Sequence, residues 1–245
     1  MKITDMCLIG SGAQADVYLW GDRAVKVYKT GCSQADINLE ADLQDRAYRA
    51  GLPVPAIYDV TETDGRRAII MEYADGRPFG ELMEAGVQST ESYLERSVDI
   101  QIRIHRITAK GFPSQSGKLK SNITAAPFLD WRQKERLSGC LKELGTGQQL
   151  CHGDFHVLNV LETPAGIRII DWLDASSGSA SADVCRSYLL YLLNKEEIAG
   201  LYLDIYCDKT KQNRQDILRW LTVIAGARLN EKVGVPEQRK LMELL

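Results

Sequence analysis

The sequence lacks the features that mark several common classes of protein. It has no run of 18 apolar residues, so it predicts no transmembrane helix. The N-terminal "MKITDMCLIGSG" has no long apolar segment after its lysine, so we expect no export signal. Its formal net charge of -3 is too small to favour nucleic acid or a membrane surface as a partner.

Paired cysteines are also missing. The six cysteines are widely scattered and form no C-x-x-C pair, which argues against a disulfide scaffold or a zinc site and favours a cytoplasmic protein. With 245 residues, 44% of them hydrophobic, the chain can bury a core without a metal or disulfides. Folding therefore requires no cofactor.

The first 73 residues favour strands. Five short segments rich in β-branched and aromatic residues are separated by turn residues, and Asp64-Gly65 is a strong hairpin signal. Residues 36–50 have helical spacing and are followed by Gly51 and Pro53. We expect a five-stranded antiparallel sheet with one main helix.

Helical periodicity dominates afterwards, over residues 90–108, 126–144, 184–193, 198–206 and 215–229. The sequence thus predicts an α+β fold with two lobes: a β-rich lobe (1–73), a hinge (74–76) and a mostly helical lobe (77–245). A short β-loop-β insert, "LCHGDFHVLNVLETPAGIRIIDWLDA", interrupts the helices. A cleft between two lobes is a natural ligand site.

A glycine-rich turn opens the β-rich part. Gly10, Gly12 and Val17 fit a G-x-G-x-x-A-x-V pattern, with Ala15 where a third glycine would be expected. Glycines between strands allow backbone N–H groups to approach phosphate oxygens. A plain hairpin turn remains the alternative.

Lys26 is a single cation within the apolar segment "AVKVY". An unpaired ammonium there would be costly, so we expect an anionic partner, and Glu40 lies on the helix that follows. Asp36 and Asp42 compete for this role. A lysine on an edge strand that extends to solvent is the other interpretation.

The segment from residue 150 to 175 allows three interpretations. His152, Asp154 and His156 alternate as metal ligands on a strand would, but Gly153 and a total of three histidines argue against a metallohydrolase. A polar turn is the second interpretation. The third is a kinase catalytic loop, H-x-D-x-x-x-x-N, with Asn159 followed by Asp171.

The order along the whole chain favours the third interpretation. The G-x-G turn, Lys26, Glu40, Asp154, Asn159 and Asp171 occur in the order of one phosphotransfer apparatus. Amide and carboxylate oxygens are hard ligands that suit Mg²⁺.

With "LCHGDFHVLNVL", "IIDW" and "IIMEYADGRPF", the sequence resembles the aminoglycoside phosphotransferase and choline kinase-like family, a branch of the protein-kinase-like fold. The resemblance implies Asp154 as the catalytic base, Mg²⁺ held by Asn159 and Asp171, and Lys26 on the ATP phosphates, paired with Glu40. GTP is not excluded as the donor. The adenine would meet three residues, Met71 by its side chain and Glu72 and Ala74 by their backbones.

The resemblance leaves several roles open. Asp183 would brace the catalytic loop or cap the helix that follows, and Asp174 would belong to the acceptor site or to a turn. His152 would be structural, and His156 has no assigned chemistry.

The expected acceptor is a hydroxyl group of a small molecule, and we expect a monomer or a weak homodimer. A small protein kinase is the alternative, but A-P-E is absent and only about a dozen residues follow Asp171 before the next helix. A catalytically silent nucleotide-binding module is another. Residues 186–245 hold eight acidic and ten basic residues, which gives no support to a pocket for polycationic aminoglycosides.

Overall fold

The computed structural model describes residues 2–12, 14–231 and 233–245. The chain divides into two compact units. The sheet unit comprises Met1–Leu82 and Leu158–Leu173, and the helical unit comprises Met83–Val157 and Asp174–Leu245. The chain therefore leaves the helical unit just after Val157 and returns to it at Asp174.

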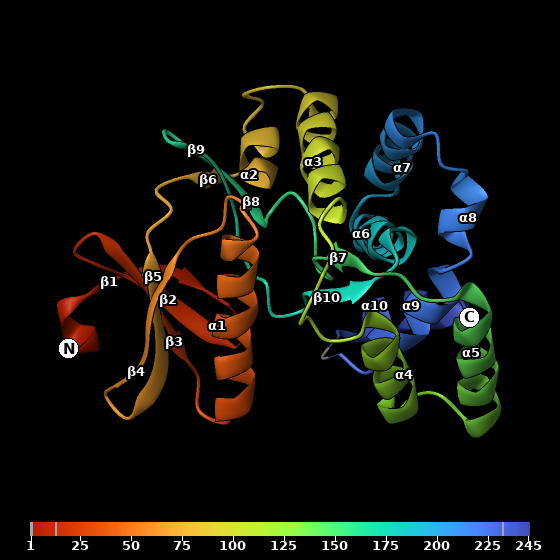
Figure 1. Ribbon diagram of the computed structural model, residues 1–245, viewed down its shortest axis with the longest axis horizontal. Coiled ribbons are helices and arrows are strands. Elements are labelled where there is room, and N and C mark those ends of the chain that lie inside the picture. The colour runs from red at the N-terminus through yellow and green to blue at the C-terminus, as the bar shows by residue number, and fades with distance from the viewer. Residues whose placement is uncertain (1, 13, 232) are drawn as a thin grey trace. The chain divides into compact units, whose positions relative to one another are not determined.

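The sheet unit is built on a five-stranded antiparallel sheet with the order β1-β2-β3-β5-β4. A 3₁₀ turn (Ile3–Asp5) precedes it. Helix α1 (Gln34–Arg49) begins after Ser33, whose hydroxyl accepts from the Ala35 N–H, and it lies beside the sheet (Figure 1). The predicted sheet with one main helix is confirmed. The strands are β1 (Cys7–Ser11), β2 (Ala15–Trp20), β3 (Arg23–Tyr28), β4 (Ile57–Thr63) and β5 (Arg66–Glu72).

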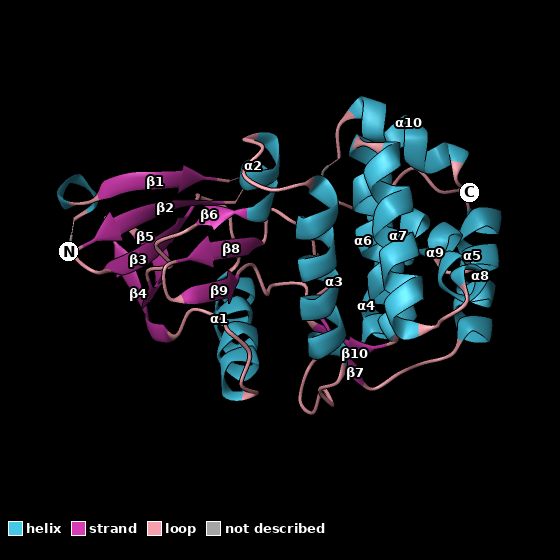
Figure 2. Cartoon of the chain, turned by 90° about the horizontal axis from the view of Figure 1, so that it is seen from above, coloured by secondary structure: helices cyan, strands magenta, loops and turns pink. Residues whose placement is uncertain are grey.

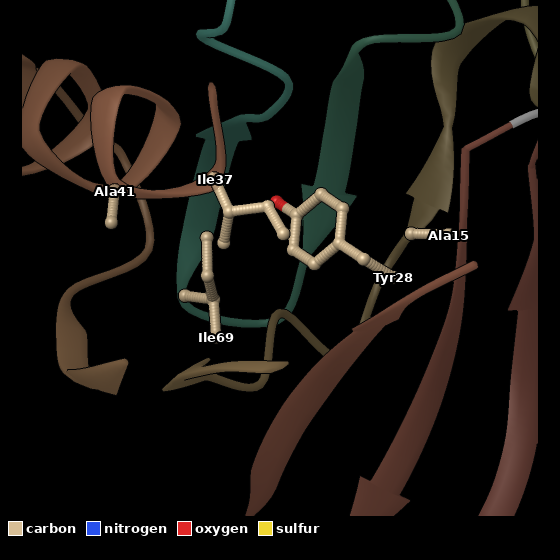
Figure 3. Packing of buried hydrophobic residues seen from close by; sticks show 5 residues of the cluster. All are labelled: Ala15, Tyr28, Ile37, Ala41 and Ile69. Atoms are coloured by element: carbon tan, nitrogen blue, oxygen red, sulfur yellow. The ribbon is translucent and has the colours of Figure 1, made fainter. Parts of the chain in front are cut away.

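Alternation along β3 divides its side chains between the two faces of the sheet. Val25 and Val27 are fully buried in the cluster on one face, with Ala68 and Ile70 of β5. Tyr28 packs on the other face in a cluster with residues of α1, and Figure 3 shows its ring against Ile37. Lys26 and Tyr28 are two residues apart on β3, so their side chains lie on the same face of the sheet. The Lys26 side chain therefore extends toward α1. The cluster drawn in Figure 3 consists of Ala15, Tyr28, Ile37, Ala41 and Ile69.

A second, three-stranded sheet completes the sheet unit (Figure 2). It has the order β6-β8-β9, with strands β6 (Arg77–Pro78), β8 (Val160–Thr163) and β9 (Gly166–Ile169). β8 and β9 form an antiparallel hairpin in which Val160 pairs with Ile169. The residues on either side of the hairpin, Asn159 and Ile170, therefore come together at its open end.

The helical unit packs α3 against α7, and α6 against α7 and α9, as Figure 1 and Figure 2 show. The two short strands β7 (Gln149–Cys151) and β10 (Ser176–Gly178) pair antiparallel beside α4 and α6. Within the described residues, no helix has the length and apolar character needed to span a membrane. The helices from α2 onward are α2 (Phe79–Glu84), α3 (Thr90–His105), α4 (Gln115–Ala125), α5 (Trp131–Leu144), α6 (Ala180–Asn194), α7 (Glu196–Thr210), α8 (Arg214–Leu218), α9 (Leu221–Arg228) and α10 (Val235–Glu243).

Several helix boundaries differ from the prediction. The helix expected over residues 126–144 begins only at Trp131, because Asp130 forms a capping box with Gln133. The helix expected over 215–229 is divided into α8 and α9, but Arg219 and Trp220 keep right-handed helical backbone angles, so the apolar period continues across the break. Helix α4 was not predicted because few of its residues are buried, and its apolar period is weak.

Candidate functional site

Lys26 lies at the centre of a charged cluster in the sheet unit. Strand β3 pairs with β2 and with β5, so the edge-strand interpretation of Lys26 is wrong. The Lys26 ammonium forms an ion pair with Glu40, which is 2% exposed and also accepts from the Tyr28 hydroxyl at 2.6 Å. Asp42 pairs instead with Arg46, at 2.8 Å on an exposed part of α1.

A second carboxylate faces Lys26. Asp171 Oδ1 lies 3.9 Å from Lys26 Nζ. Burial would lower the pKa of Lys26, but the charges of Glu40 and Asp171 outweigh this effect, and the pKa is raised. Lys26 therefore stays protonated and links α1 to the segment after β9.

Asn159 and Asp171 extend from the open end of the β8–β9 hairpin. The Ile170 N–H donates to the Asn159 carbonyl at 3.0 Å, which holds the two ends of the hairpin together. Asn159 is buried, whereas the Asp171 side chain is 47% exposed. The backbone of Asp171 is left-handed, with φ 65°, a conformation that Asp and Asn tolerate best among residues with a side chain.

Asn159 and Asp171 carry side chains that could hold a magnesium ion. Carboxylate and amide oxygens are the ligand types that Mg²⁺ takes, and a partly exposed carboxylate leaves room for water and phosphate oxygens. The ammonium of Lys26, near Asp171, adds a group that attracts phosphate.

The glycine-rich turn joins β1 to β2. Neither Gly10 nor Gly12 has a positive φ, and a Cβ on Gly10 would come no closer than 3.9 Å, to Val17 Cβ. The chain itself thus has space for a side chain at Gly10, and the lack of one leaves the backbone accessible to a ligand. Lys29, which the sequence did not single out, donates from Nζ to the Gly12 carbonyl at 2.5 Å.

The residues expected near the adenine lie at the end of β5. Met71 and Glu72 are its last residues, and Ala74 follows outside the strand. The Glu72 N–H donates to the Ala56 carbonyl at 2.8 Å, and its carboxylate accepts from Arg168 at 2.8 Å. These two groups of Glu72 are therefore already used within the sheet unit.

In the helical unit, Asp183 braces the loop that carries Asp154. Its carboxylate accepts from the N–H groups of Gly153 at 2.7 Å and His152 at 3.3 Å, and contacts His105 Nε2 at 2.9 Å. Asp183 lies within α6, whose N-cap is Ser179, so the alternative role as a helix cap is wrong. The sequence placed His105 in a helical pattern but did not predict its contact with Asp183.

His152 also supports this loop. The side chain is fully buried, and Nδ1 accepts from the Asp154 N–H at 3.3 Å. Among the described residues, no group of three or more His, Cys, Asp or Glu side chains is placed to hold a metal ion. His152 thus acts here as a structural hydrogen-bond acceptor.

The Asp154 carboxylate lies between two basic side chains. Oδ1 is 3.5 Å from the Arg186 guanidinium and Oδ2 is 3.5 Å from His156 Nε2. Burial would raise the pKa of Asp154, but hydrogen bonding to His156 and the charge of Arg186 hold it well below the usual range. Asp154 is therefore ionised at neutral pH.

Sequence reasoning missed Arg186. It lies on α6 and is nearly buried, and its guanidinium also contacts Glu231 at 2.9 Å. The signal in the sequence was a single arginine in the apolar helical segment "VCRSYLLYLL". A buried charge of this kind requires a partner, which the sequence alone did not identify.

A pocket opens in the helical unit next to this loop. Its empty volume, counting the open solvent at its mouth, is about 500 Å³. Gly153, Asp174 and Glu231 line it, together with residues of α4, β10, α6 and α9. Asp174 pairs with Lys118 at 2.9 Å across the pocket wall.

Comparisons with known proteins identify the fold and the family. A search of curated protein sequences finds no match. Among solved structures, a thermostable mutant of aminoglycoside phosphotransferase APH(4)-Ia, in ternary complex with ADP and hygromycin B, matches with 14% identity and a TM-score of 0.69, covering 98% of this chain and 90% of that one.

Two further structures have the same fold. An amicoumacin kinase in complex with AMP-PNP and Ca²⁺ matches with 14% identity and a TM-score of 0.66, over 99% of this chain and 87% of that one. An ethanolamine kinase of Plasmodium vivax matches with 11% identity and a TM-score of 0.63, over 92% and 74% of the two chains.

The family is established by sequence. Residues 5–215 match the model of the APH family, described as the phosphotransferase enzyme family. This match spans most of the chain, from before the glycine-rich turn to beyond α6. The resemblance inferred from the motifs is therefore confirmed: the chain belongs to the phosphotransferase enzyme family.

Proposed function

We propose that the protein transfers the γ-phosphoryl group of ATP to a hydroxyl group of a small molecule. The observation that carries this proposal is the position of the Lys26 ammonium, paired with Glu40 and near Asp171 at the open end of the hairpin. A partly buried, charged lysine near two carboxylates is an arrangement suited to nucleotide phosphates.

In the proposal, the chain binds the nucleotide through the sheet unit. Lys26, oriented by Glu40, holds the α- and β-phosphates, and the backbone near Gly10, Gly12 and Val17 covers them. Asn159 and Asp171 hold Mg²⁺, which neutralises charge on the phosphates when bound. The complexes of related folds with AMP-PNP and Ca²⁺, or with ADP, support an adenine nucleotide and a divalent cation.

The remaining nucleotide contacts are assigned to the end of β5. Met71 lies beside the adenine, and the backbones of Glu72 and Ala74 bind its edge. GTP remains a second candidate donor. Because both nucleotides and Mg²⁺ are abundant in the cytoplasm, we propose that the protein acts there, as a monomer or a weak homodimer.

Asp154 is the proposed catalytic base. Since the phosphoryl transition state is loose, proton removal contributes little early in the reaction, and positioning of the hydroxyl matters most. The Asp154 carboxylate is ionised and held by Arg186 and His156, so it can accept a hydrogen bond from the acceptor hydroxyl and later its proton.

A small molecule fits the helical unit better than a protein substrate does. Only eight residues, 172–179, separate Asp171 from the start of α6, and three of them form β10. This leaves little chain for a platform that binds a peptide. Hygromycin B and amicoumacin occur in the complexes of related folds, which supports a small acceptor.

The test is to incubate the protein with MgATP and a library of hydroxyl compounds and to search for the mass gain of one phosphoryl group. We expect at least one phosphorylated product, and we expect Asp154→Asn to lose about 10²-fold or more in rate. Asp208→Asn, an exposed carboxylate on α7, is the matched control.

Two results would change the assignment. Unchanged turnover in Asp154→Asn would remove Asp154 from the reaction. Nucleotide binding without any phosphorylated small molecule would favour the silent module, and phosphate transfer to protein would favour the protein kinase.

A further inference from the structure

The charges that line the pocket of the helical unit balance one another. Three cationic side chains and three carboxylates line it among the described residues. A pocket that recognises a polycation presents carboxylates whose charge is not already neutralised by the protein. A cationic ligand would therefore need at least one of these three carboxylates to be available. The charged lining residues are Lys118, Arg186, Arg228, Asp174, Asp183 and Glu231.

Asp183 is not available to an acceptor. Its side chain is 1% exposed, and both oxygens are already used, by His105 and by the backbone of the catalytic loop. An ammonium group of a ligand would have to displace buried hydrogen bonds to reach it.

Glu231 is held by two arginines. Arg186 contacts Oε1 at 2.9 Å through one guanidinium nitrogen and Oε2 at 3.0 Å through another, and Arg228 contacts Oε2 at 2.6 Å. Arg228 itself also pairs with Glu237 at 2.6 Å. The two guanidinium groups neutralise the charge of the Glu231 carboxylate, so it attracts a further cation only weakly.

Asp174 is the most exposed of the three, with half of its side chain accessible, but Lys118 already occupies it. The Lys118 ammonium donates to Asp174 Oδ1 at 2.9 Å. A cationic ligand would have to displace this lysine and would then lie close to an ammonium of the same sign.

Uncharged polar groups complete the lining. Asn122 on α4 and Ser176 on β10 can bind hydroxyl groups without a charge, and Leu119, Ile224 and Ala227 contribute apolar surface. Hydroxyl groups on a largely carbon ring match such a mixture.

We propose that the acceptor is an uncharged polyhydroxyl compound, such as a sugar or cyclitol, and that Lys118, which occupies Asp174, selects against polycationic aminoglycosides. This inference rests on the proposed function, because it assigns the pocket to the acceptor. A pocket that prefers neutral compounds has the opposite selectivity to a pocket for cationic aminoglycosides.

Matched pairs of acceptors test the proposal. With MgATP, we expect greater phosphorylation of glucose than of glucosamine, and of neutral disaccharides than of kanamycin. In parallel, calorimetric titration of kanamycin in the presence of MgADP measures binding without turnover, and we expect no saturable heat with the unchanged protein.

The variant Lys118→Gln should free Asp174. We expect the preference for glucosamine over glucose to rise about two- to fivefold, the effect of one partly exposed ion pair. Lys120→Gln is the matched control, because Lys120 lies on the same helix but is exposed and outside the pocket lining.

The outcomes separate this inference from the proposed function. Tight binding of kanamycin by the unchanged protein, or a preference for the amino sugar, would overturn the inference while a phosphorylated product would still support phosphotransfer. Absence of any phosphorylated compound would contradict the proposed function, and the kanamycin titration would still decide whether the pocket rejects a polycation.

Discussion

The backbone N–H of Gly153 donates a hydrogen bond of 2.7 Å to Asp183 Oδ1. This bond fixes the residue that precedes Asp154 to the first turn of α6. The same carboxylate also contacts His105, on α3, at 2.9 Å. Asp183 thereby ties a loop and two helices together, and the position of Asp154 depends on a buried residue of a different element.

Asp183→Asn should lower the free energy of unfolding by about 2–5 kcal/mol, because it removes a buried charge that His105 and two backbone donors stabilise. Urea denaturation at pH 7 measures this change. Asp208→Asn, on exposed α7 surface, should change it by less than about 0.5 kcal/mol.

The same variant should alter the pH dependence of stability. Burial would raise the pKa of Asp183, but hydrogen bonding to His105 and Gly153 lowers it below the ordinary 3.8. The carboxylate thus contributes stability above about pH 4, and this contribution is lost as pH falls below that value. Denaturation between pH 5 and pH 2 should show a shallower decline for the variant, and an equally steep decline would contradict this account.

Gly153→Ala should impair both folding stability and turnover. Gly153 has φ 83°, and a Cβ there would lie 2.3 Å from the Asp174 carbonyl oxygen, so backbone must shift. We expect a loss of at least about 2 kcal/mol in stability. Gly200→Ala in α7 is the control, because its Cβ meets nothing within 4 Å, and this change should be neutral or stabilising.

Asp171→Asn should raise the Mg²⁺ concentration needed for half-maximal activity by about tenfold or more, because the proposed magnesium site would lose its charged ligand. Asn adopts the left-handed backbone of Asp171 as readily as Asp does, so the fold should persist. Titration of activity with Mg²⁺ measures the effect. Asp64, which also has a left-handed backbone, provides the control Asp64→Asn, and an equal shift there would exclude a specific role for Asp171.

A double-mutant cycle should show that Lys26 and Glu40 act as a pair. With Lys26→Met, Glu40→Gln and both together, the changes in kcat/KM for ATP should be non-additive by about 1–3 kcal/mol, since the second substitution removes an interaction already lost. The exposed pair of Asp42 and Arg46 on the same helix should give a coupling below about 0.5 kcal/mol. Full additivity for Lys26 and Glu40 would contradict the pairing.

The sequence by itself determined the five strands and the main helix of the sheet unit, because β-branched residues, turn residues and helix-ending glycines act over a few residues. It also singled out Lys26, Asp154, Asn159 and Asp171 as candidate site residues, since each belongs to a short motif with a chemical requirement. It did not reveal α4, whose few buried side chains leave little periodicity.

Only the tertiary structure decided which of these residues meet. Glu40 rather than Asp42 pairs with Lys26 because it lies on the face of α1 that packs on the sheet. The hairpin register brings the carbonyl of Asn159 to the N–H of Ile170, next to Asp171. Helix packing places Arg186 against Asp154. Such partners are far apart in the chain, and their contact depends on packing and register, which no local pattern encodes.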